Sequence, residues 1–271
     1  MPHEKLDALL KKYGEKVFLA LTSYRILGMP RLPGMATGLT IEDISHLIDK
    51  GGDPTIRDGQ GRDFLAVLSQ SKHVFIKKEM LELLLSNGCD VYYTQPIPFV
   101  EGNKKADILF EMCWNNVTVN QDVAQILIEH FENKENFSYD AQEMIPEYMY
   151  GMMRNVNGFI QVPNTVQYFC DMCPTLFDND LFQGENGIYA LEGICGQRIP
   201  PQEFYSYLCG FEERGFTIHK IYEKSAQNEK IQSQDECEEV VLSLKAKKKI
   251  EDFLSQKRAR NVISETPEPL F

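Results

Sequence analysis

Two cysteines three positions apart, Cys170 and Cys173, have the spacing in this sequence that comes closest to a chemical site. A CxxC pair can supply half of a structural zinc site or form a redox couple. A zinc site needs four ligands, and neither a second CxxC nor a closely spaced histidine pair accompanies this one. Because Tyr168, Phe169 and Met172 surround the pair, we expect buried helical cysteines and no metal.

A short acidic stretch, Asp178-Asn179-Asp180, begins like a calcium-binding loop. An EF-hand loop carries glycine at its sixth position and glutamate at its twelfth, where this sequence has Gln183 and Tyr189. The stretch therefore predicts a turn.

Nucleophilic catalysis needs a serine or cysteine with a base held beside it. The sequence contains neither Gly-x-Ser-x-Gly nor a phosphate-binding Walker loop, and its histidines match no catalytic signature: His3, His46, His73, His130 and His219. We expect no catalytic residues and no cofactor. The alternative from the enzyme class is a cysteine-dependent hydrolase that uses Cys113 or Cys195 together with enlarged loops.

The charge balance argues against nucleic acid as a partner. The chain has 28 basic and 40 acidic residues, a net charge of −12, and such a protein repels phosphate backbones. Basic residues do gather between Ser243 and Arg260: Lys245, Lys247, Lys248, Lys249, Lys257, Arg258 and Arg260. A basic helix of this kind fits an acidic partner, a membrane surface or a solvated helix face.

The sequence also bears on the compartment. Met1 to Lys5 lead into no apolar signal-peptide core, and no apolar run approaches the ~20 residues of a membrane span. Seven cysteines, an odd number scattered through apolar patterns, fit reduced thiols better than a disulfide framework. We expect a cytoplasmic protein without an integral membrane segment.

An internal repeat organises the chain. The stretches Leu47–Pro54 and Leu83–Val91 share a helix end, a glycine and then an aspartate, with Gly51 and Gly88 37 residues apart. A fixed period between ~20 and ~50 residues is typical of stacked repeats.

Two longer spacings support the repeat. Gly61 and Gly187 are 126 residues apart within similar stretches, and Gly88 and Gly215 are 127 apart. Apolar residues at helical intervals occur between these points, for example over Asp107–Cys113, while prolines fall between the patterns. The pattern predicts an all-α protein built from helix pairs.

The stretch Asp53-Pro54-Thr55-Ile56-Arg57-Asp58-Gly59-Gln60-Gly61-Arg62 resembles the β-hairpin finger of the ankyrin repeat. The resemblance in sequence covers roughly Ile41 to Val91. Elsewhere only the expected arrangement of helix pairs is similar. Where the family has Thr-Pro-Leu-His, only a leucine is kept, as Leu65, Leu109 and Leu191. The units exceed the usual ~33 residues, so we expect enlarged connections across 91–103 and 133–164.

The resemblance implies an ankyrin-like α-solenoid with short β-hairpin fingers or loops. We expect an N-terminal helical cap over 1–40, divergent repeat units over 41–216 and a C-terminal helical cap over 217–260. Pro267 and Pro269 bar a helix near the end, so 261–271 is expected to be a flexible tail.

Because ankyrin-repeat proteins mostly bind other proteins, the resemblance implies a protein-protein interaction scaffold or adaptor that binds through its fingers and concave face. A variant of this hypothesis is a translocated effector of an intracellular bacterium or virus, acting in the host cytosol. The expected partner-binding residues, taken as exposed, are Arg57, Asp58, Gln60, Arg62, Tyr92, Tyr93 and Trp114. The expected repeat core includes Leu65, Leu84, Ile126 and the Met- and Tyr-rich stretch 147–154.

Overall fold

The computed structural model describes residues 3–22, 39–70, 76–92, 95–96, 105–115, 119–135, 139–154, 163–196, 200–232 and 240–265. Regular structure in this part of the chain is helical, apart from one antiparallel pair of two-residue strands, β1 (Gln95–Pro96) and β2 (Lys105–Ala106). The expected all-α class is confirmed.

The chain divides into two compact units. The first comprises Met1–Asp140 with Gln161–Val166, and the second comprises Ala141–Ile160 with Gln167–Phe271. Each unit has its own buried apolar side chains. The boundaries of the expected caps at 40/41 and 216/217 stay a prediction.

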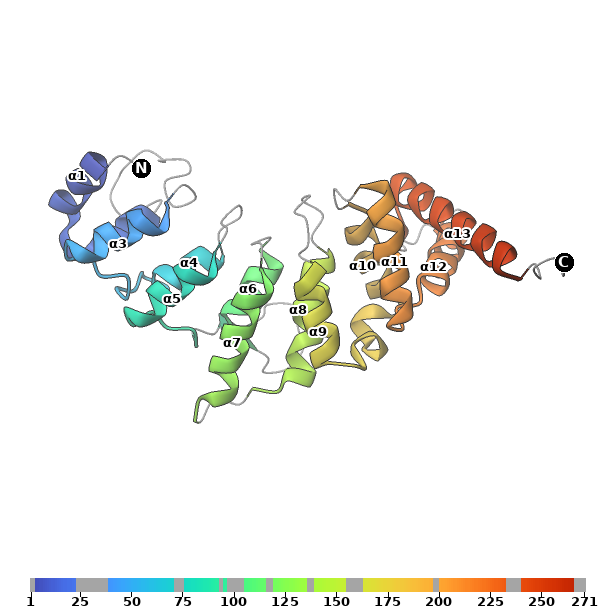
Figure 1. Cartoon of the computed structure of the whole chain (residues 1–271), viewed down its shortest axis with the longest axis horizontal. Coiled ribbons are helices and arrows are strands. Elements are labelled where there is room, and N and C mark those ends of the chain that lie inside the picture. The colour runs from blue at the N-terminus through green and yellow to red at the C-terminus, as the bar shows by residue number, and fades with distance from the viewer. Residues whose placement is uncertain are drawn as a thin grey trace, which may run out of the picture. The chain divides into compact units, whose positions relative to one another are not determined.

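The first unit is a stack of helix pairs (Figure 1). One row contains α2, α4 and α6, in which α4 packs against both of the others; a second row contains α3, α5 and α7, and α1 packs on α3. The bounds are α1 His3–Tyr13, the 3-10 turn η1 Gly14–Lys16, α2 Val17–Thr22, α3 Ile41–Asp49, α4 Phe64–Ser69, α5 Lys78–Ser86, α6 Ile108–Trp114 and α7 Gln121–Asn133.

In the second unit α10 is the central helix, because α8, α12 and α13 all pack against it. The bounds are α8 Ala141–Arg154, the 3-10 turns η3 Leu176–Asp178 and η4 Asp180–Phe182, α10 Gly184–Gly196, α11 Pro201–Glu213, α12 Ile218–Gln232 and α13 Leu244–Glu265. Helix α9, Pro163–Met172, has its first residues in the first unit and the rest in the second. The predicted turn at Asp178–Asp180 is confirmed, and the Asn179 side chain accepts a hydrogen bond from the Leu181 N–H.

Helix α8 corrects the expectation of an enlarged connection over 133–164. Pro146 lies in the second turn of α8, where it removes a single N–H donor without ending the helix. The Met- and Tyr-rich stretch is buried as expected, with Tyr148, Met149 and Met153 fully shielded from solvent.

Three helices end in the same backbone motif. Gly51, Gly88 and Gly215 have φ angles of 94°, 88° and 98°. In each case the glycine N–H and the next N–H donate to carbonyls of the last helical turn, for example Gly88 to Leu85 at 3.0 Å and Cys89 to Leu84 at 3.1 Å. This is the Schellman motif, which needs a residue in the left-handed region.

The aspartate two positions after Gly51 and Gly88 forms the same turn in both copies. Asp53 Oδ1 accepts from the Thr55 N–H at 2.8 Å, and Asp90 Oδ1 accepts from the Tyr92 N–H at 2.9 Å. Such Asx turns reverse the chain locally. The structure thus confirms the 37-residue repeat as a repeat of backbone geometry.

The similarity between the stretches around Gly61 and Gly187 is wrong as a structural equivalence. Gly61 lies in a turn before α4, whereas Gly187 lies inside α10. A Cβ at Gly187 would approach the Phe182 carbonyl oxygen at 2.8 Å and the Ile221 side chain at 3.1 Å. Glycine is used there for close packing of α10 against η4 and α12, not for a turn.

Two further expectations are wrong, one about the burial of Ile126 and one about where the last helix ends. Ile126 is half-buried, because Val123, Leu127 and Phe131 occupy the core-facing side of α7, whereas Leu65 and Leu84 are fully buried as expected. Helix α13 continues to Glu265, into the stretch expected to be a flexible tail. Pro267 disfavours helical geometry only at the residue before it, so 261–265 remain helical; residues 266–271 lie outside the described residues.

The positive φ at Gly88 leads to a stability prediction. We expect Gly88→Ala to lower the free energy of unfolding by about 1–2 kcal/mol, because an L-residue is strained in the left-handed region. Gly59→Ala is the matched control, since its added Cβ meets open space without a positive φ, and should stay within about 0.5 kcal/mol. Equal losses in urea unfolding of the two variants would contradict the Schellman assignment.

Candidate functional site

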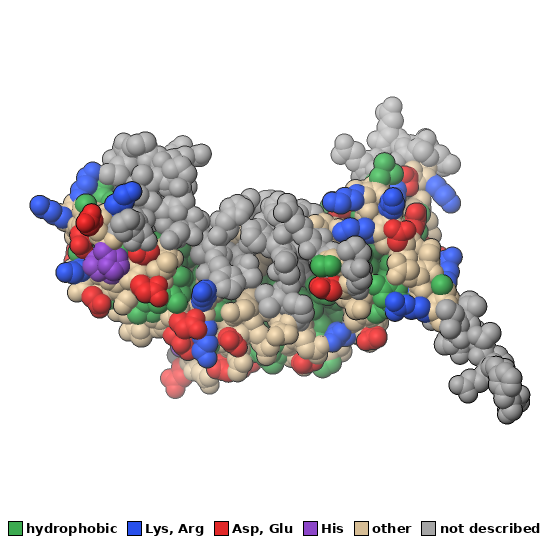
Figure 2. Space-filling model, turned by 45° about the horizontal axis from the view of Figure 1, so that its top comes forward, with side chains coloured by type: hydrophobic (Ala, Val, Ile, Leu, Met, Phe, Trp, Pro, Cys, Tyr) green, Lys and Arg blue, Asp and Glu red, His purple; other side chains and the backbone are tan. Residues whose placement is uncertain are grey.

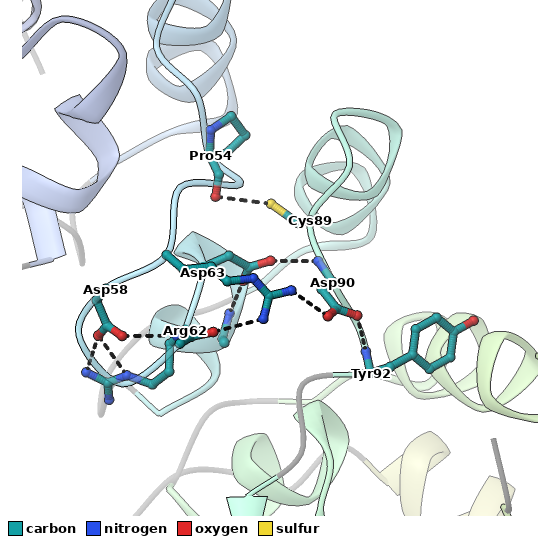
Figure 3. Close-up of polar contacts among 10 residues, drawn as sticks. Pro54, Asp58, Arg62, Asp63, Cys89, Asp90 and Tyr92 are labelled. Carbon is teal, nitrogen blue, oxygen red and sulfur yellow. Dashed lines mark hydrogen bonds and ion pairs between the residues drawn. The ribbon is translucent and has the colours of Figure 1, made fainter. Parts of the chain in front are cut away.

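The finger loop, Asp53–Arg62, is held together from within (Figure 3). The Asp58 carboxylate accepts hydrogen bonds from the backbone N–H groups of Gln60 and Arg62 at 2.8 and 3.0 Å. It also pairs with the Arg62 guanidinium at 2.9 and 2.7 Å. The loop is a closed turn without a β-hairpin.

The expectation that all four finger residues are exposed is wrong for two of them. The side chains of Asp58 and Arg62 expose only 10% and 23% of their surface, because each is the other's partner, whereas Arg57 and Gln60 are exposed. Burial favours a higher pKa at Asp58, but the bonds from Arg62 and Gln60 outweigh it and lower the pKa below its usual value.

Asp63 joins the two ends of a helix pair. It is 3% exposed and caps α4, since its Oδ1 accepts from the Ala66 N–H at 2.9 Å. Its Oδ2 accepts from the Asp90 N–H at 2.6 Å, in the loop that leaves α5 (Figure 3). Burial raises the pKa of Asp63 although the two N–H bonds act to lower it.

Asp107 occupies the corresponding position at the start of α6. It is 2% exposed, and its Oδ1 accepts from the Phe110 N–H at 2.7 Å. The comparison with the ankyrin Thr-Pro-Leu-His motif noted only the leucines Leu65 and Leu109 at these helix starts, and it did not identify the aspartates as N-caps. The available signal was an aspartate directly before an apolar helix pattern, which is a typical N-cap.

The finger loop and the exit loop, Cys89–Tyr92, are bonded to each other. The Arg57 guanidinium pairs with the Asp90 carboxylate at 2.8 Å and also donates to the Gly61 carbonyl at 3.0 Å. The Pro54 carbonyl accepts from the Phe64 N–H at 3.1 Å and faces the Cys89 thiol at 3.6 Å. Arg57 nevertheless keeps 49% of its side chain exposed.

Tyr92 connects the exit loop to the next helix pair. Its hydroxyl donates to the His130 carbonyl at 3.0 Å, and its ring lies edge-on to Phe131 with centroids 6.2 Å apart. The Lys134 ammonium lies 3.2 Å from the ring centroid, a cation–π contact. Tyr92 is thus a half-buried side chain of the exit loop that lies against the end of α7.

The remaining two expected residues lie elsewhere. Trp114 is half-buried on α6 and stacks on Phe110 with ring centroids 5.2 Å apart. Tyr93 lies outside the described residues. The candidate site therefore comprises the exposed Arg57 and Gln60 of the finger loop, together with Tyr92 and Lys134 at the end of α7. Lys134 is an addition that sequence reasoning missed.

The cysteines of the hydrolase alternative are unsuited to nucleophilic attack. Cys113 and Cys195 are each 1% exposed. Burial raises the pKa of Cys113 well above its usual value and that of Cys195 to about 12, so the reactive thiolate is disfavoured at both.

The CxxC pair is buried as expected, with Cys170 and Cys173 8% and 3% exposed. Burial raises the pKa of Cys170 to about 11. Among the described residues, no group of three or more His, Cys, Asp or Glu side chains is placed to hold a metal ion.

Several basic side chains of α13 bind acidic or carbonyl groups elsewhere in the chain. Lys247 pairs with Glu229 and Lys257 with Glu212, both at 2.5 Å, while Lys249 donates to the Cys195 carbonyl at 2.6 Å. Arg260 lies over the Tyr205 ring. Lys and Arg side chains are interspersed with acidic ones on the face of the molecule that Figure 2 shows. Lys245, Lys248 and Arg258 are exposed, and an acidic partner or a membrane surface for this helix stays a prediction.

Comparison of the chain with protein-family models, with curated proteins and with solved structures finds no match. In the described part of the chain, no helix combines the length and the apolar character that crossing a bilayer requires.

The two bonds of Asp63 predict an unusually costly N-cap. We expect Asp63→Ala to lower the free energy of unfolding by about 2–3 kcal/mol, because it removes a cap and leaves the part-buried Asp90 N–H without its acceptor. The control is Asn120→Ala on α7, whose side chain caps the Val123 N–H, and it should cost about 1 kcal/mol. Similar losses in chemical denaturation would show that the bond to Asp90 contributes nothing.

Thiol burial predicts the labelling pattern of the native protein. Among the cysteines in the described part of the chain, an alkylating reagent at pH 8 should label the half-buried Cys209 first, while Cys89, Cys113 and Cys195 should react only on unfolding. Peptide mapping by mass spectrometry identifies the modified positions. Rapid labelling of Cys113 or Cys195 in the folded state would revive the hydrolase alternative.

Proposed function

We propose that this chain is a divergent ankyrin-type repeat protein that acts as a protein-binding scaffold or adaptor. In this proposal the loops between helix pairs contact the partner and the helices hold those loops in a fixed order. No catalytic residue, cofactor or metal is needed for this function.

The observation that carries the proposal is the repeated end of the helix pair. The Schellman glycines Gly51 and Gly88 and the Asx turns at Asp53 and Asp90 recur at one spacing of 37 residues. Repeated loops of equal geometry on stacked helix pairs form an extended surface, which is how repeat proteins bind partners. The fixed loop geometry also reduces the conformational entropy lost on binding.

The binding surface we propose comprises Arg57, Gln60, Tyr92 and Lys134. Arg57, Gln60 and Lys134 are exposed, and Tyr92 and Lys134 are in contact with each other. Arginine and tyrosine are enriched among the residues that dominate binding energies. Asp58 and Arg62 support the loop without facing a partner.

The test is comparative affinity capture from native-cell lysate. We expect the double variant Gln60→Ala/Lys134→Ala to lose at least about tenfold of the captured partner while its melting temperature stays close to that of the wild type. Lys78→Ala is the control, because it removes the same charge from an exposed position on α5, outside the loops. A partner set that is identical for all three proteins would place binding outside the loops.

The effector variant of this hypothesis and the cytosolic location stay predictions. The hydrolase alternative has against it the burial of Cys113 and Cys195. A scaffold therefore remains the function that the described residues support best.

A further inference from the structure

A four-residue segment in the second unit, Val240–Ser243, is bound like a peptide ligand. This segment, which we call the strap, precedes α13 and belongs to no helix. It lies against α10 and α12. Helix α13, which follows it, packs against α10 and slants away toward the C-terminus (Figure 1).

Two buried side chains of α12 bind the strap through its backbone. The Asn228 amide donates to the Val240 carbonyl at 2.8 Å, and the Ser225 hydroxyl accepts from the Leu242 N–H at 2.8 Å. Both side chains are fully buried. Paired bonds to alternate backbone groups are the usual way in which a protein holds an extended peptide, because they do not depend on the peptide's side chains.

Side-chain selectivity comes from the next two strap residues. Leu242 is 2% exposed, so the surface around it accepts a large apolar side chain. The Glu192 carboxylate on α10 accepts from both the N–H and the hydroxyl of Ser243, at 2.9 and 2.8 Å. The surface of α10 and α12 that holds the strap, which we call the groove, therefore selects a leucine followed by a residue with a hydroxyl group.

Exposed apolar side chains lie close in sequence to the strap and to the residues that hold it. Three large apolar side chains stand out as exposed in the described part of the chain, Leu244 at 83%, Tyr189 at 41% and Ile231 at 40%. Leu244 follows the strap directly, Tyr189 lies one helical turn before Glu192, and Ile231 lies one turn after Asn228. Clustered exposed apolar residues are typical of protein interaction sites.

The fit of the strap also leaves one polar atom unused. Asn228 Oδ1 is buried and has no hydrogen-bond partner among the described residues, although its amide nitrogen holds Val240. A buried acceptor without a donor is costly. A ligand with one further N–H in reach would bind this groove better than the strap does.

We propose that the groove between α10 and α12 is a peptide-binding site that the chain's own strap occupies in cis. Its ligand is an extended segment of a partner protein in which leucine is followed by serine or threonine. The strap competes with that segment, so the affinity for the partner is reduced by the fraction of molecules in which the groove is closed. The inference rests on the proposed protein-binding function and names a partner class for a second surface.

The probe is a fluorescein-labelled peptide with the sequence of Val240–Lys257, titrated into the full chain and followed by fluorescence anisotropy. We expect Leu242→Ala in the chain to weaken the strap and raise peptide affinity by about tenfold or more. Asn228→Ala added to that variant should abolish the gain, because it removes a groove contact without restoring the strap. Ser243→Ala is a milder opening variant, used if Leu242→Ala alters the circular dichroism spectrum.

The control peptide carries Leu242→Ala and Ser243→Ala and has the same charge, so it reports electrostatic attraction to the acidic chain. Equal affinity of wild type and both opening variants, or equal binding of the control peptide, would overturn the proposal. A dimer of the wild-type chain that the peptide dissociates would make a second copy the occupant and would also overturn it. These outcomes do not involve the loop surface, so failure here is distinguishable from failure of the proposed function.

Discussion

The buried carboxylate of Asp63 is the interaction on which the repeated geometry of the first unit depends. Helix α4 has six residues and α5 has nine, and helices this short are unstable in isolation. Asp63 caps α4 with one oxygen and fixes the exit of α5 with the other, so one side chain sets both ends of the pair. The position of the exit loop, and with it Tyr92, follows from that bond.

The loops show how one segment combines stability with recognition. Asp58 and Arg62 satisfy the turn internally, which leaves Gln60 at an exposed position of fixed geometry. A loop held in this way loses little conformational entropy on binding. Cys113 and Cys195 contrast with these residues, because burial raises the pKa of both thiols and suppresses their ionisation.

The sequence predicted those parts of the structure that depend on local backbone geometry. A glycine with an aspartate two positions later is typical of a left-handed residue followed by an Asx turn. The 37-residue repeat at Gly51 and Gly88 could therefore be predicted from the sequence. What depends on packing between distant elements was not. In the sequence Gly187 resembles a turn glycine, but in the structure it lies inside a helix and allows close contact with Ile221. The small exposed fraction of Asp58 depends on its ion pair with Arg62. The strap was missed because its ligands, Ser225 and Asn228, lie on another helix.

The pairing of Arg57 with Asp90 has a consequence for the salt dependence of binding. The Arg57 guanidinium bonds to Asp90 and to the Gly61 carbonyl but keeps 49% of its side chain exposed, so a partner carboxylate can bind it beside Asp90. Because the Asp90 carboxylate already offsets the positive charge of Arg57, the net charge that dissolved salt can screen at this contact is small. The affinity of this contact should therefore change little with ionic strength. Selectivity among acidic partners comes from how well their carboxylate geometry matches the planar guanidinium.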